Sequence, residues 1–112
     1  MYEIVKFSFP FAEDFDKSKP RPCVVISPSF SKHNHIILAY ITTDTKDVLD
    51  TDIVLDKAEP YFSLTGLRSN SVIKLHRLIT VTPSQIGIAI GILPDELIKE
   101  LKKKLQKVFR LK

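Results

Sequence analysis

The arginine at position 21 is the residue best placed for chemistry, because two prolines flank it where a polar loop turns into an apolar run. Proline fixes its own φ and favours extended backbone for the residue before it, so Pro20 and Pro22 constrain Arg21 from both sides. A guanidinium held in this way presents a planar set of donors that matches a phosphate or a carboxylate. The alternative is a structural loop arginine that pairs with Asp14 or Asp16.

Three further polar residues stand on predicted strands and could act with Arg21. Thr42 closes an apolar run, while Lys74 and His76 lie two residues apart and therefore project from the same face of one strand. Metal-free cleavage of RNA needs a base for the ribose 2′-hydroxyl, an acid for the 5′-oxygen and fixed donors for the charge on the phosphate. Histidine gains and loses a proton near neutral pH, so His76 suits either proton step. A strand histidine can also be purely structural.

Other chemistries lack their residues. His33 and His35 have no Cys, Asp or Glu at metal-ligand spacing, and the three glycines are too far apart for a phosphate-binding loop. No serine lies on a strand-to-helix elbow. The single cysteine, Cys23, excludes an intrachain disulfide, and its apolar strand favours core packing over nucleophilic chemistry. We therefore expect no metal and no cofactor.

Length and composition predict one domain, residues 1–112, with 44% hydrophobic residues. The longest apolar run, near residues 36–41, is too short for a bilayer, and acidic Glu3 stands where a signal peptide has basic residues, so a cytoplasmic protein is expected. Residues 1–60 carry 7 Lys and Arg against 10 Asp and Glu, whereas residues 61–112 carry 10 against 3. The basic half is compatible with a polyanion or an acidic peptide.

Hydrophobic periodicity predicts a mostly β protein with one terminal helix. Thr82 to Gln85 forms a capping box with a proline at the first helical position, which predicts a single helical turn. Pro94 opens the terminal helix, whose apolar side chains fall on one stripe. Together the elements predict a small, strongly bent antiparallel barrel with the helix packed across it. The predicted strands are residues 3–9, 22–27, 35–42, 52–55, 71–81 and 88–92.

The order of these elements resembles the MazF/PemK/Kid family of toxins from type II toxin–antitoxin modules. No single motif is diagnostic, but the ordered set covers nearly the whole chain. The motifs that carry the resemblance are Ile4-Val5, Phe9-Pro10-Phe11, Lys19-Pro20-Arg21-Pro22 with Val24-Val25-Ile26-Ser27, Ile41-Thr42-Thr43, Gly66-Leu67, Ser71-Val72-Ile73 and Ile90-Gly91-Ile92-Leu93.

The resemblance implies an SH3-like barrel of the CcdB/PemK type, a homodimer, and an mRNA interferase. This enzyme would cleave single-stranded RNA at short sequence motifs without a metal, through a 2′,3′-cyclic phosphate, and a peptide antitoxin would inhibit it. Arg21 and Thr42 correspond to the catalytic arginine and threonine of the family. Lys74 and His76 occupy the places of a further arginine and of an aspartate that act as acid and base in the Kid-like branch. RNA-binding residues are expected in or beside the motifs, at Lys19, Thr43, Arg68 and Ser71.

Two other functions remain compatible with the same barrel. One is a non-catalytic poison of DNA gyrase, as the related CcdB toxins are, although that branch does not need the Arg-Pro and Ile-Thr motifs for catalysis. The other is an inactive barrel that only binds nucleic acid or an acidic peptide, which salt-sensitive RNA binding without turnover would reveal.

Overall fold

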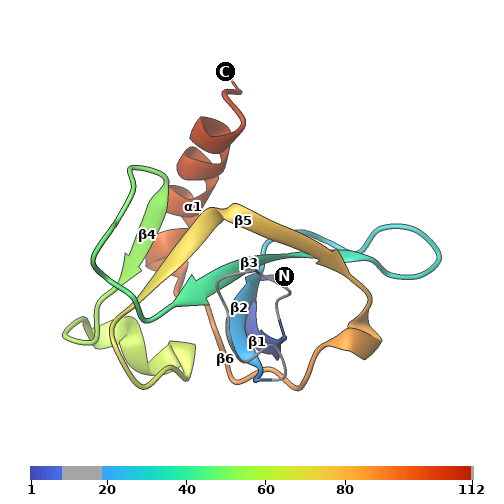
Figure 1. The fold of residues 1–112 in the computed structure, drawn as a ribbon, viewed down its shortest axis with the longest axis horizontal. Helices are drawn as coiled ribbons and strands as arrows, with labels where there is room; N and C mark the ends of the chain where they lie inside the picture. Colours follow the sequence, from blue (N-terminus) through green and yellow to red (C-terminus); the bar gives the residue numbers. More distant parts are fainter. Residues whose placement is uncertain (9–18, 112) are drawn as a thin grey trace.

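A six-stranded antiparallel sheet forms the body of the protein (Figure 1). The computed structural model describes residues 1–8 and 19–111. The strand order is β4-β5-β3-β2-β1-β6. The sheet is curled, and it is an open half-barrel because the edge strands β4 and β6 do not pair with each other. The strands are β1 (Glu3–Phe7), β2 (Arg21–Val25), β3 (Ile36–Thr42), β4 (Asp52–Leu55), β5 (Ser71–Val81) and β6 (Gly91–Ile92).

Two hydrophobic clusters lie on the two faces of the sheet, one on each face. The larger one includes Val24, Ile41 and Ile73 and packs against Leu97 and Leu101 of helix α1 (Asp95–Val108). The smaller one gathers the alternate residues of the same strands on the opposite face. Its buried members are Val5, Cys23, Val25, Ile36, Leu38 and Val81. Helix α1 therefore covers one face, and the face turned away from it has polar side chains at its margin.

A β-bulge divides β5 into two segments. Tyr40 of β3 pairs with Lys74, but the preceding Ala39 pairs with Leu78, so three residues of β5 are passed over between consecutive residues of β3. Extra residues of this kind bend a strand and increase its twist. The prediction of a long or bent strand at 71–81 is confirmed, and the bulge lies directly after Lys74.

The 3₁₀ helix η1 (Pro60–Thr65) reaches β6 and closes the gap that strand pairing leaves open. Gly66 ends η1 with φ 71°, a left-handed conformation, and a Cβ there would lie 2.0 Å from the Ile90 carbonyl oxygen. A Cβ on Gly91 would lie 2.2 Å from the Thr65 carbonyl carbon. Two glycines therefore let the two backbones meet at this seam.

Most predicted elements are confirmed, including strands 52–55 and 71–81, and the turn at 83–85, where the Thr82 N–H donates to the Gln85 side chain at 2.8 Å. The predicted last strand is wrong in extent. Only Gly91–Ile92 is a strand, because the segment before it contacts β1 through single hydrogen bonds, and Ile88 is 88% exposed. Phe9, where the first strand was expected to end, lies outside the described residues, as do Asp14 and Asp16.

Candidate active site

The strand registers place the predicted site residues on the face of the sheet turned away from α1. Cys23 pairs with Tyr40, so continuing this register by two residues brings Arg21 opposite Thr42. Thr42 pairs with Val72, and Lys74 lies two residues further along β5. Residues opposite each other in antiparallel strands share a face, and diagonal neighbours lie about 7–8 Å apart. Arg21, Thr42 and Lys74 therefore come from three adjacent strands to one end of this face.

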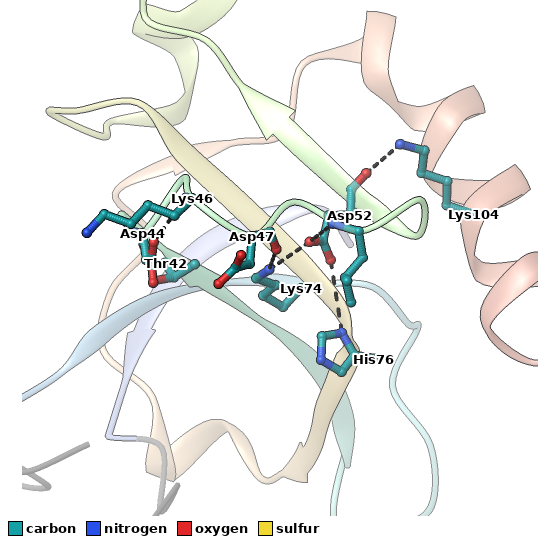
Figure 2. Close-up of polar contacts among 9 residues, drawn as sticks. Thr42, Asp44, Lys46, Asp47, Asp52, Lys74, His76 and Lys104 are labelled. Carbon is teal, nitrogen blue, oxygen red and sulfur yellow. Dashed lines mark hydrogen bonds and ion pairs between the residues drawn. The ribbon is translucent and has the colours of Figure 1, made fainter. Parts of the chain in front are cut away.

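The Thr42 hydroxyl group is oriented by the loop that follows β3. The backbone N–H of Asp44 donates to Oγ1 of Thr42 at 3.1 Å, as Figure 2 places the two residues side by side. A hydroxyl group that accepts a hydrogen bond keeps its own O–H as a donor. That O–H has no acceptor among residues 1–8 and 19–111, so Thr42 can donate to an oxygen that a substrate brings.

Lys74 and His76 both reach one buried carboxylate, that of Asp52 on β4 (Figure 2). The Lys74 ammonium group donates to Asp52 Oδ2 at 2.7 Å and to the Asp47 carbonyl oxygen at 3.0 Å. His76 Nδ1 lies 4.0 Å from Asp52 Oδ1. An ammonium group has three donors, and the described part of the chain commits two of them, which leaves a third that can serve a ligand.

Arg77 is a candidate site residue that the sequence did not reveal. Its guanidinium carbon lies 4.8 Å from the centroid of the Tyr40 ring, in the range of a cation–π contact. Strict alternation along β5 places Arg77 on the face opposite to Lys74, but the bulge turns it toward Tyr40, the residue that pairs with Lys74. The signal was the spacing of the core leucines, because Leu75 and Leu78 are three residues apart instead of two.

The four expected RNA-binding residues divide into two groups. Lys19, Thr43 and Arg68 are exposed: Lys19 precedes β2, Thr43 follows Thr42, and Arg68 lies on the loop that leads into β5. The expectation for Ser71 is corrected, because Ser71 is 1% exposed and its hydroxyl group donates to the Ser69 carbonyl oxygen at 2.9 Å. The Ser71 side chain therefore supports the loop and has no surface to offer RNA.

The other histidines and the cysteine do not belong to this group of residues. His33 and His35 belong to the β2–β3 loop, at the opposite end of β3 from Thr42, and His35 Nδ1 lies 2.9 Å from the Ser31 hydroxyl oxygen. No three His, Cys, Asp or Glu side chains in the described part of the chain are grouped to hold a metal ion. Cys23 is fully buried, and burial raises the pKa of its thiol to about 12, in agreement with a packing role.

No helix in the described ranges has both the length and the apolar character needed to cross a membrane.

Solved structures with the same fold come from mycobacterial toxins. The Mycobacterium tuberculosis toxin MazF-mt6 is 21% identical, with a TM-score of 0.74 over 98% of each chain. An endoribonuclease from a mycobacterial species, in complex with its cognate antitoxin, is 11% identical, with a TM-score of 0.71 over 99% of this chain and 94% of that chain. A further mycobacterial endoribonuclease is 12% identical, with a TM-score of 0.67 over 99% and 91%. No curated protein sequence matches the chain significantly.

The chain is therefore a curled antiparallel half-barrel with one C-terminal α-helix, and cationic and hydroxyl side chains lie on the face of the sheet turned away from that helix. Residues 1–109 match the model of the PemK-like, MazF-like toxins of type II toxin–antitoxin systems. The chain belongs to this family, and the predicted fold class and resemblance are confirmed.

Proposed function

We propose that the protein is a toxin endoribonuclease that cleaves single-stranded RNA by attack of a ribose 2′-hydroxyl on the adjacent phosphate. The observation that carries the proposal is that Arg21, Thr42 and Lys74 come to one end of one sheet face, and that His76 shares the Asp52 carboxylate with Lys74. The family match and the titles of the solved mycobacterial endoribonucleases support the same class of enzyme.

Arg21 and Thr42 stabilise the charge that grows on the phosphate. When the 2′-oxygen bonds to phosphorus, the non-bridging oxygens gain negative charge, and preorganised donors aimed at them lower the barrier. The guanidinium supplies a paired set of donors, and the Thr42 hydroxyl, held by the Asp44 N–H at 3.1 Å, supplies another. The remaining Lys74 donor and exposed Lys19 add positive charge along the RNA backbone.

His76 moves the proton. The 2′-hydroxyl loses a proton to the imidazole as the 2′-oxygen attacks, the bond from phosphorus to the 5′-oxygen breaks, and the leaving 5′-oxygen takes a proton from water. The products are a 2′,3′-cyclic phosphate and a 5′-hydroxyl. The His76 side chain is 45% exposed, so the ring is accessible to a substrate.

Two partners complete the proposal. One structural relative was solved with its cognate antitoxin, and we assign this protein an antitoxin peptide or protein that blocks the RNA-binding face. We also assign it a homodimeric state, for which exposed Phe109 (56%) and Leu111 (64%) at the end of α1 offer apolar surface. Sedimentation at micromolar concentration tests the dimer, and a monomer would contradict it.

The decisive experiment is incubation of a long RNA with the protein in EDTA, comparing wild type with Arg21→Ala. We expect fragments with 2′,3′-cyclic phosphate ends from the wild type and a loss of about 100-fold or more in the variant, as for removal of a fixed donor to a transition state. Lys102→Ala, which removes an exposed cation of α1 on the side of the sheet away from the site, serves as the control and should retain most of the activity. Equal cleavage by wild type and Arg21→Ala would refute the assigned mechanism.

A further inference from the structure

One oxygen of the buried Asp52 carboxylate has no hydrogen-bond partner in the described part of the chain. The residue is 0% exposed, and its Oδ2 accepts from Lys74 at 2.7 Å and from the Leu49 N–H at 2.8 Å. Its Oδ1 has no hydrogen-bond partner within residues 1–8 and 19–111. Leaving a buried acceptor unsatisfied costs about 1–3 kcal/mol, and more when the group is charged. An oxygen of this kind indicates a donor that arrives when the site is in use.

The imidazole of His76 offers a nitrogen donor beside this oxygen. Its Nδ1 lies 4.0 Å from Asp52 Oδ1, and Figure 2 shows the ring directly facing the carboxylate. A hydrogen bond needs about 2.7–3.2 Å, so the two atoms must approach by roughly 1 Å. The half-exposed His76 ring is free to turn, whereas the carboxylate is not. Catalytic hydrogen bonds are often long in a free enzyme and shorten when substrate binds.

Asp52 is held from several directions, and this makes it a fixed reference for the ring. It begins β4 and pairs directly with Lys74 of β5. Its N–H donates to the Leu49 carbonyl at 3.0 Å, and its own carbonyl accepts a hydrogen bond from the Lys104 ammonium group of α1. The sheet, the preceding turn and the helix therefore all fix the backbone or the side chain of Asp52, as Figure 2 shows for the lysines.

We propose that Asp52 is the positioning residue of the active site and that it acts through His76. In the RNA complex Oδ1 of Asp52 accepts the Nδ1–H of His76, so the proton of the neutral ring is on Nδ1 and the lone pair of Nε2 points to the ribose 2′-hydroxyl. When the ring takes the 2′-hydroxyl proton on Nε2, the carboxylate stabilises the imidazolium that forms. Lys74 holds the other carboxylate oxygen and keeps it from turning. This assignment rests on the proposed endoribonuclease function.

The first test is the tautomer of His76, read from ¹⁵N long-range correlation NMR spectra of the protein alone and with an RNA analogue lacking 2′-hydroxyls. We expect the Nδ1–H form in the wild type with the analogue. In Asp52→Asn the amide oxygen can keep the Leu49 and Lys74 donors while its NH₂ group faces the ring, so the Nε2–H form should replace it. The control Asp50→Asn, at an exposed carboxylate of the same turn, should leave the tautomer unchanged. The Nε2–H form in the wild type with the analogue would overturn the proposal, even if Asp52→Asn does not fold.

The second test is a double-mutant cycle on cleavage kinetics. We expect Asp52→Asn to lower kcat by about 100-fold with KM little changed, as for loss of a general base, and to add almost nothing in a His76→Ala background. An additive loss, or an unchanged kcat in a folded Asp52→Asn, would overturn the role of Asp52 while the cleavage function stands. A wild type that cleaves no RNA would instead refute the proposed function, and the tautomer would still decide whether Asp52 orients His76.

Discussion

Replacing Lys74 by Met should be among the most destabilising single changes on this face of the sheet. The lysine side chain is 13% exposed and Asp52 is 0% exposed, so the pair is shielded from water. Without the ammonium group, Oδ2 of Asp52 keeps only the Leu49 N–H and Oδ1 keeps no partner in the described structure. Removing one partner of a buried ion pair costs about 3–5 kcal/mol, because the other charge stays buried and uncompensated.

The same chain contains a matched control. Lys107 Nζ of α1 lies 3.4 Å from Asp50 Oδ2, but these side chains are 58% and 88% exposed. An exposed ion pair contributes about 0–1 kcal/mol, so Lys107→Met should change stability by no more than that. The two variants remove the same charge from the same kind of partner, and they differ mainly in burial.

Urea unfolding followed by circular dichroism measures the difference. We expect Lys74→Met to lower the free energy of unfolding by several kcal/mol more than Lys107→Met, with similar denaturant slopes. The double variant Asp52→Leu with Lys74→Met should recover much of the loss, since apolar replacement of a buried pair is often neutral. A loss for Lys74→Met of about 1 kcal/mol or less would refute the view that Asp52 is a buried charge that depends on Lys74 for its compensation.

Three further predictions follow from single residues. Thr42→Val should lower RNA cleavage by about 100-fold while Thr42→Ser keeps most of it, because only the hydroxyl group donates; equal activities in a fragment assay would contradict this. Gly91→Ala should cost about 1–3 kcal/mol in urea unfolding, since the Cβ would meet the Thr65 carbonyl group at 2.2 Å, and an unchanged midpoint would argue against the tight seam. The pKa of Cys23, raised by burial to about 12, means that the folded state keeps its thiol proton where the unfolded chain loses it. Between about pH 9 and pH 12, stability relative to Cys23→Ala should therefore fall with rising pH, by up to about 1.4 kcal/mol per pH unit, and parallel pH curves would contradict it.

Local patterns were enough to predict the strands and the terminal helix. Apolar runs located β4 and β5 at their observed bounds, and the residues around Pro83 predicted the short helical turn. The last strand was overestimated because an apolar run of isoleucines does not reveal whether a partner strand is present beside it. The residues around Ile88 have the sequence pattern of a strand, but Ile88 is exposed and lies outside β6.

The candidate site was predictable only in part, for reasons of pairing. The spacing of Lys74 and His76 placed both on one face, and both reach Asp52. Asp52 itself gave no signal, because a strand's own sequence does not tell which strand it pairs with. Arg77 was missed since a bulge reverses the alternation that follows it. Both residues were missed because their positions depend on which residues of distant strands pair with each other.

The pairing of β1 with β6 has a consequence for how the protein is made. Glu3 lies opposite Ile92, and β3 pairs with β5 across the whole middle of the chain, so the sheet joins segments that are synthesised far apart in time. Such non-local contacts require the ends of long loops to meet and form slowly. A nascent chain that ends before residue 71 has β2 and β3 but lacks the partner that supplies Lys74 and His76. Most of the chain must therefore leave the ribosome before the face that carries the candidate site can assemble.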